Sequence, residues 1–136
     1  MSNYHSPLIL AASNSNNVSS IETVILLLDS GADINFKSNL GSTALIAAAS
    51  CSRATSNLTT VKLLLERGAN PNLTDYGGDM ALIEAARKSN TTSSFETVKM
   101  LLDSGANIEL KNNCGNTALL ASIKNLNSWI KMPEKN

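Results

Sequence analysis

Blocks of apolar and polar positions alternate along this chain, and one such block recurs at a fixed step. The phrase SSIETVILLLDSGAD begins at Ser19, and the nearly identical phrase SSFETVKMLLDSGAN begins at Ser93. A third copy, SNLTTVKLLLERGAN, begins at Ser56, so the step is 37 residues on either side. A constant period between about 20 and 50 residues marks an array of stacked structural repeats. The chain is therefore expected to be one repeat array.

Each repeat predicts two helices. The first is a short segment rich in alanine and leucine, two good helix formers, which recurs over residues 6–12, 43–49 and 80–86. The second carries a wide apolar face, as at Val61 and Leu63–Leu65, which needs a covering surface. A glycine suited to a left-handed C-terminal cap follows each second helix. These glycines are Gly31, Gly68 and Gly105.

Polar residues mark the predicted starts of the second helices and the turns between units. Ser19 and Ser93 are predicted N-caps of second helices, because Glu22 and Glu96 follow three residues later in the capping-box pattern. The copy at Ser56 has a threonine in place of the glutamate, which predicts a weaker cap. Between units, polar segments closed by glycine predict turns over residues 35–41, 72–78 and 109–115.

These elements form an all-α array in one domain, 1–136. Its approximate units are 1–30, 31–67, 68–104 and 105–136. One helix pair of this size cannot bury its own apolar face, whereas stacked neighbours can. We therefore expect Leu64 to lie in the core between units.

The repeated residues resemble the ankyrin repeat family. The segments that carry this resemblance are GSTALIAAA from Gly41 to Ala49, VKLLL from Val61 to Leu65 and GAN from Gly68 to Asn70. The resemblance implies an ankyrin-repeat solenoid of stacked antiparallel helix pairs, with hairpin-like turns at right angles to them. It also implies that another protein binds to the turns and first helices, on the concave side.

Three features depart from the family pattern. The usual proline remains only at Pro7, and isoleucine or leucine replaces the usual histidine, as at Ile46. The period of 37 also exceeds the common ankyrin period of about 33 residues. The additional residues fall in Ser/Asn-rich runs such as Ser50–Thr55, which favours a longer loop, although one more turn on the first helix is the alternative.

Composition narrows the class of partner and the compartment. Eleven Lys and Arg balance eleven Asp and Glu without a basic stripe, so no nucleic acid is expected. No apolar run approaches the roughly 20 residues that cross a membrane, and the N-terminus lacks the pattern of a signal peptide. Cys51 and Cys114 lack metal-ligand spacing. We expect an intracellular protein, most naturally cytoplasmic, with neither metal nor cofactor.

Candidate catalytic chemistry is sparse. His5 is the only histidine and has no partner nearby in the sequence. Asp75, Asp79 and Glu84 come closest to a carboxylate cluster, which we interpret as a solvated turn and helix edge. No catalytic residue and no enzyme activity are expected.

The resulting hypothesis is a non-enzymatic protein–protein interaction module that is itself a monomer. Its expected patch centres on Tyr76, with Glu84 exposed beside it, because tyrosine is a favoured interface anchor. The partner-binding residues that we expect are Asn39, Leu40, Ser42, Tyr76, Asp79, Glu84, Arg87, Lys88, Asn113 and Asn116.

Two alternatives remain open. Arrays with incompletely capped ends would stack end to end as a structural protein. Asn35 and Asn72 match the turn asparagine that ankyrin hydroxylases modify, although a purely structural bond to the turn backbone is favoured. Near the C-terminus, Leu126, Trp129 and Ile130 lie close to helical spacing. Whether Trp129 covers the last exposed core, or whether further units of a longer chain follow, is also open.

Overall fold

The computed structural model describes residues 6–13, 18–50, 55–87 and 92–123, and side chains at 18–20, 55–57 and 92–94 are not described. Helix pairs recur along the chain, as the period predicted. The helices are α1 (Pro7–Ser13), α2 (Val18–Asp29), α3 (Ala44–Ser50), α4 (Thr55–Glu66), α5 (Ala81–Arg87) and α6 (Thr92–Asp103). Residues 118–123 are also helical and repeat the position of the first helices.

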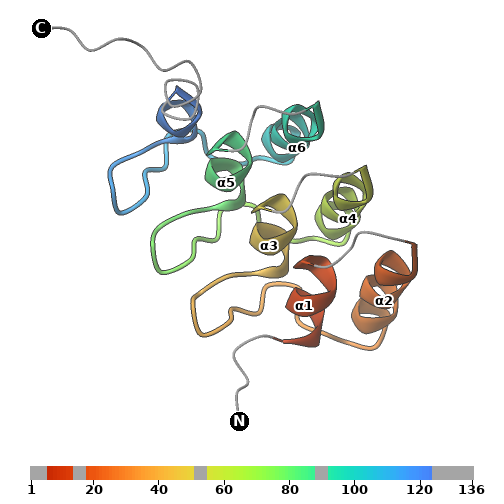
Figure 1. The fold of residues 1–136 in the computed structure, drawn as a ribbon. Helices are drawn as coiled ribbons and strands as arrows, with labels where there is room; N and C mark the ends of the chain where they lie inside the picture. The colour runs from red at the N-terminus through yellow and green to blue at the C-terminus, as the bar shows by residue number, and fades with distance from the viewer. Residues whose placement is uncertain (1–5, 14–17, 51–54, 88–91, 124–136) are drawn as a thin grey trace, which may run out of the picture.

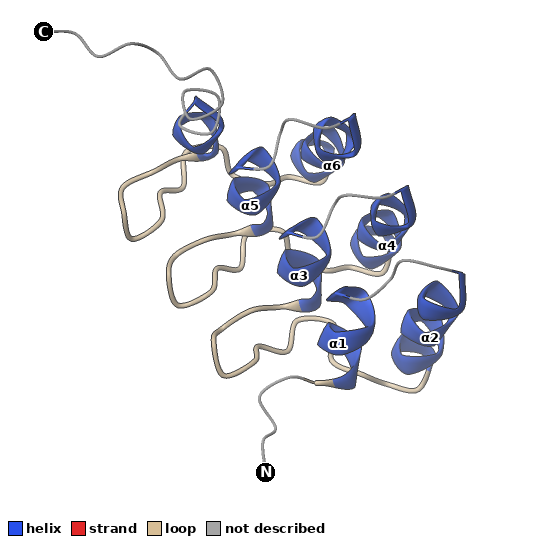
Figure 2. Ribbon diagram, viewed as in Figure 1, coloured by secondary structure: helices blue, strands red, loops and turns tan. Residues whose placement is uncertain are grey.

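The helices form two layers (Figure 1). One layer contains α1, α3 and α5, and the other contains α2, α4 and α6, so each helix contacts its pair partner and its counterpart in the next unit. Loops project side by side from the first layer, away from the second (Figure 2). Within the described residues no strand forms, and the only sheet-like pairing is an isolated bridge between Thr74 and Met80. The all-α solenoid is confirmed.

First helices start at a hydroxyl cap in three of the four units. The side-chain oxygen of the residue before the helix accepts the N–H of the residue three positions on, which satisfies one orphan donor of the first turn. These bonds join Ser6 to Ile9 (3.2 Å), Thr43 to Ile46 (3.2 Å) and Thr117 to Leu120 (3.3 Å). The third unit has the buried Met80 at this position instead.

Second helices begin earlier than the sequence predicted. They start at Val18, Thr55 and Thr92, so Ser19, Ser56 and Ser93 belong to the first turn and are not the caps that precede it. Ser50 and Thr55, the two ends of the polar run between the helices, are both helical. Residues 51–54 lie outside the described residues, and so does the choice between a loop and an added turn.

Second helices end as the glycines predicted. Gly31 has φ of 99°, and Gly68 and Gly105 have φ of 93° and 96°. The N–H of Gly31 donates to the carbonyl of Leu28 at 3.1 Å, and that of Ala32 donates to Leu27 at 3.0 Å. This pair of bonds is the Schellman motif, in which a left-handed residue ends the helix and its last carbonyls gain donors. None of the described helices is both long and apolar enough to cross a bilayer.

A continuous core runs along the stack. Leu45, Leu64, Leu82 and Leu101 are almost completely buried, each at an interface between neighbouring helices. Alanines of the first helices, such as Ala48 and Ala85, are also buried and allow close approach between units.

We expect Leu64→Ala to lower the free energy of unfolding by about 2–5 kcal/mol, the usual cost of truncating a buried leucine. Chemical denaturation followed by circular dichroism measures this loss. Leu26→Ala is the matched control, because Leu26 is 64% exposed on α2 and its loss should cost about 0.5 kcal/mol or less. Equal losses for the two variants would contradict the placement of the core.

Candidate partner-binding site

All three projecting turns are built by the same set of bonds. Ser38, Asp75 and Asn112 occupy the first position, where each N–H donates to the carbonyl of the residue four positions on, at 2.9 Å. The glycine before that residue donates its N–H back to the first position, also at 2.9 Å. The side-chain oxygen of the first residue accepts two further N–H groups from inside the turn, at 2.9–3.2 Å. Ser, Asp and Asn are interchangeable here because each supplies a short-range acceptor.

The turns are also bonded to one another at their tips. The N–H of Tyr76 donates to the carbonyl of Leu40 at 3.1 Å, and the N–H of Asn113 donates to the carbonyl of Gly77 at 2.9 Å. The Asn113 side chain adds a bond from Nδ2 to the Tyr76 carbonyl at 2.9 Å. Consecutive tips are therefore held as a row.

Two large side chains are exposed along this row of turn tips. Tyr76 is 68% exposed and Leu40 is 63% exposed, and Asn39 and Asn113 are exposed beside them. The Tyr76 ring lies directly over Gly41, since a Cβ at Gly41 would come within 2.7 Å of its Cδ1. The ring is thus positioned by the preceding turn while most of its surface faces solvent.

The acidic residues beside the row form an ion-paired group. Arg87 Nη2 lies 3.2 Å from Asp79 Oδ1, and Arg87 Nη1 lies 3.2 Å from Glu84 Oε2. Partial burial lowers the pKa of Arg87, but the Asp79 hydrogen bond and the charges of Glu84 and Asp79 outweigh this effect, so the pKa lies above its ordinary value. Asn112 Nδ2 donates to Asp79 Oδ1 at 2.8 Å. This group links the turn at 75–79 to the turn at 112–116.

Carboxylate oxygens of Asp75, Asp79 and Glu84 lie within 4.8 Å of one another, so the cluster seen in the sequence does assemble. Asp75 Oδ1 accepts two backbone N–H groups, and the other two carboxylates pair with Arg87. The arrangement therefore supports the turn and helix start. Glu84 keeps only 15% of its side chain exposed and is held in an ion pair with Arg87, so its expected exposure is wrong.

The remaining predicted residues divide by exposure. Ser42 and Asn116 are half-buried, and their backbones close the turns. Cys114 is a free, exposed thiol in the turn at 112–116. Lys88, Cys51 and His5 lie outside the described residues. The sequence analysis missed Ser38 and Asn112, although turn-forming residues at the 37-residue spacing of Asp75 were a signal for both.

Comparison with known families agrees with this geometry. A family model described as ankyrin repeats (3 copies) matches residues 2–75 and 54–131. The chain belongs to the ankyrin-repeat family. Ankyrin repeats are generally protein–protein interaction modules, and the family is typically non-enzymatic. A search of curated proteins found no match for this chain.

In this ankyrin array Asn35 and Asn72 join consecutive units. Asn35 Oδ1 accepts the N–H of Asn70 at 3.0 Å, and Asn72 Oδ1 accepts the N–H of Asn107 at 2.7 Å. Asn72 Nδ2 also donates to the carbonyl of Gly105 at 3.2 Å. Each asparagine thus bonds the backbone of the following unit.

We expect Asn72→Ala to lower the free energy of unfolding by roughly 1–2 kcal/mol, because two hydrogen bonds between units are lost. Glu109→Ala is the matched control at the same position of the next repeat, where an exposed side chain predicts a loss of about 0.5 kcal/mol or less. Urea denaturation of both variants measures the difference. If Glu109→Ala lowers the free energy of unfolding as much as Asn72→Ala does, the hydrogen bonds between units are not the source of the loss.

Alanine substitutions at two glycines distinguish the stability that comes from contact between turns from the stability that comes from turn conformation. Gly78 and Gly115 have φ of 82° and 81°, so alanine at either position should cost about 1–2 kcal/mol of left-handed strain. A Cβ at Gly78 would also lie 2.7 Å from the Asn113 nitrogen, whereas at Gly115 it meets nothing within 4 Å among the described residues. Gly78→Ala should therefore lose a further 1–3 kcal/mol or so in the same measurement. Equal losses would mean that the tips are not in contact.

Proposed function

We propose that this chain is a non-enzymatic protein–protein interaction module that binds its partner through the turn tips and first helices, on the concave side of the array. The observation that supports the proposal most strongly is the row of tips joined by hydrogen bonds, with Leu40 and Tyr76 exposed on it. A surface that is ordered before binding loses little conformational entropy on association.

Affinity on this surface should rest on the two large tip residues. Tyrosine offers wide contact area with few rotors and a polar end, and interface energy concentrates in such anchors. The carboxylates of Asp79 and Glu84 would favour a basic partner, but both already pair with Arg87. Their charge is partly balanced, so it should affect the association rate more than the affinity.

Hydroxylation of Asn35 and Asn72 is less well supported as a function. Their side-chain oxygens accept N–H groups of the next unit, and a hydroxylase would have to break these bonds to reach the side chains. Intact mass after exposure to an asparagine hydroxylase tests this alternative directly, since each modification adds one oxygen.

The binding surface is tested by the double variant Leu40→Ala/Tyr76→Ala. Interface anchors commonly contribute 2 kcal/mol or more, so affinity for a captured partner should fall at least about tenfold in calorimetric titration. Folding should change little, since truncation at exposed sites costs about 0.5 kcal/mol each.

The control is Lys62→Ala/Lys99→Ala, which changes exposed residues of α4 and α6 on the opposite layer. This variant should bind normally. Loss of binding in the lysine variant, with full binding in the tip variant, would place the interface on the second helices and refute the proposal.

A further inference from the structure

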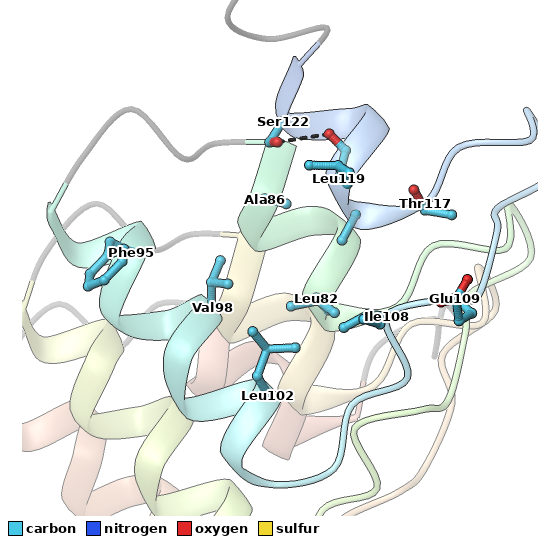
Figure 3. A pocket seen from close by; sticks show the side chains of 11 residues that line it. Leu82, Ala86, Phe95, Val98, Leu102, Ile108, Glu109, Thr117, Leu119 and Ser122 are labelled. Carbon is cyan, nitrogen blue, oxygen red and sulfur yellow. Dashed lines mark hydrogen bonds between the residues drawn. The ribbon is translucent and has the colours of Figure 1, made fainter.

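An apolar groove of about 550 Å³ opens at the C-terminal end of the described array (Figure 3). Its walls come from α5, from α6, from the loop after α6 and from helical residues 118–123. Six of the side chains that line it are Leu82, Phe95, Val98, Leu102, Ile108 and Leu119. Several of these leave large apolar areas in solvent, including 62% of Phe95 and 56% of Ile108.

This groove resembles one side of the interface between two stacked units, and none of the described residues supplies the other side. Leu119 occupies the repeat position of Leu45 and Leu82, which are each 1% exposed because the next unit covers them, yet Leu119 is 69% exposed. Leu120 occupies the repeat position of Ile83, which is fully buried, and Leu120 is 41% exposed. The surface therefore has the shape and chemistry that elsewhere in this chain receive an apolar helix.

We infer that residues 124–136 of the same chain cover this groove, with the Trp129 side chain as its principal occupant. This segment directly follows the helical wall at 118–123, and it carries Leu126, Trp129 and Ile130 at spacings of three and four, which place side chains on one helical face. A groove of this size with a mainly apolar lining suits a large ring such as indole. The inference concerns the end of the array and is independent of the turn surface.

Covalent attachment favours this occupant over a separate molecule. Six residues lead from Ile123 to Trp129, enough to span up to about 20 Å when extended. Leu119 and Ser122, just before this segment, already line the groove, so the groove lies within reach of the indole. A tethered segment acts at an effective concentration in the millimolar range, whereas a second copy must overcome the entropy of association. A covered groove would also keep two arrays from stacking end to end.

Tryptophan fluorescence tests the inference in the full chain, because Trp129 is its only tryptophan. In the wild type, Trp129 should emit at a shorter wavelength than in the chain unfolded by guanidinium, and dilution should leave the emission unchanged. Leu119→Asp places a charge in the groove and should move the emission toward that of the unfolded chain. Leu26→Asp is the matched control, a similarly exposed leucine on α2 at the other end, and should leave the emission at the wild-type wavelength.

Circular dichroism establishes that each variant keeps its helices. If Leu119→Asp loses them, Ile108→Asp tests the same groove from the exposed loop. The inference would be overturned if wild-type Trp129 emitted at the wavelength of the unfolded chain. It would also be overturned if neither groove substitution changed the emission wavelength. Solution mass decides the remaining case. If the wild type is a dimer, and the groove substitutions both dissociate it and move the Trp129 emission toward that of the unfolded chain, then a second copy occupies the groove and the inference is wrong.

Discussion

The constraint on which this structure depends is that no helix pair can bury its own apolar face. Leu64 on α4 and Leu82 on α5 are buried in a core to which both the pair partner and the neighbouring units contribute. At about 25 cal/mol for each Å² of apolar surface, this contact is the main source of stability in the array. A fixed period follows from it, because an interface repeated with the same residues requires the same spacing between them.

The turn surface is a consequence of that stacking. Once the helices are in register, the loops between units must lie side by side, and their backbone groups come within hydrogen-bonding distance. The bond from Tyr76 to Leu40 and the bond from Asn113 to Gly77 join turns 37 residues apart at equivalent positions. Asn35 and Asn72 make the same kind of connection nearer the helices. Apolar packing thus sets the register, and polar contacts between units join the turns into one continuous row.

Features that repeat were predictable from the sequence, and features that depend on one unit were not. The helix pairs, the left-handed glycines and the buried Leu64 follow from periodicity and local propensity, and the structure confirms them. The exposure of Glu84 was predicted wrongly, because its pairing with Arg87 occurs in one repeat only and leaves no periodic signal. The starts of the second helices were misplaced, since serines and threonines surround each boundary and several could serve as caps.

Core and tip positions differ in how far their residues vary from one unit to the next. The core position of Leu45 and Leu82 holds leucine in both units, because each must fill the same space between helices. The tip position of Tyr76 holds asparagine in the units before and after it. Bonds within and between the turns there use mainly backbone groups and the side chain of the first turn residue, so the tip side chain is not needed to form the turn. A tip residue can therefore change without loss of the fold. If the proposed function holds, this freedom is what would let an array of nearly identical units present a distinctive surface to one partner.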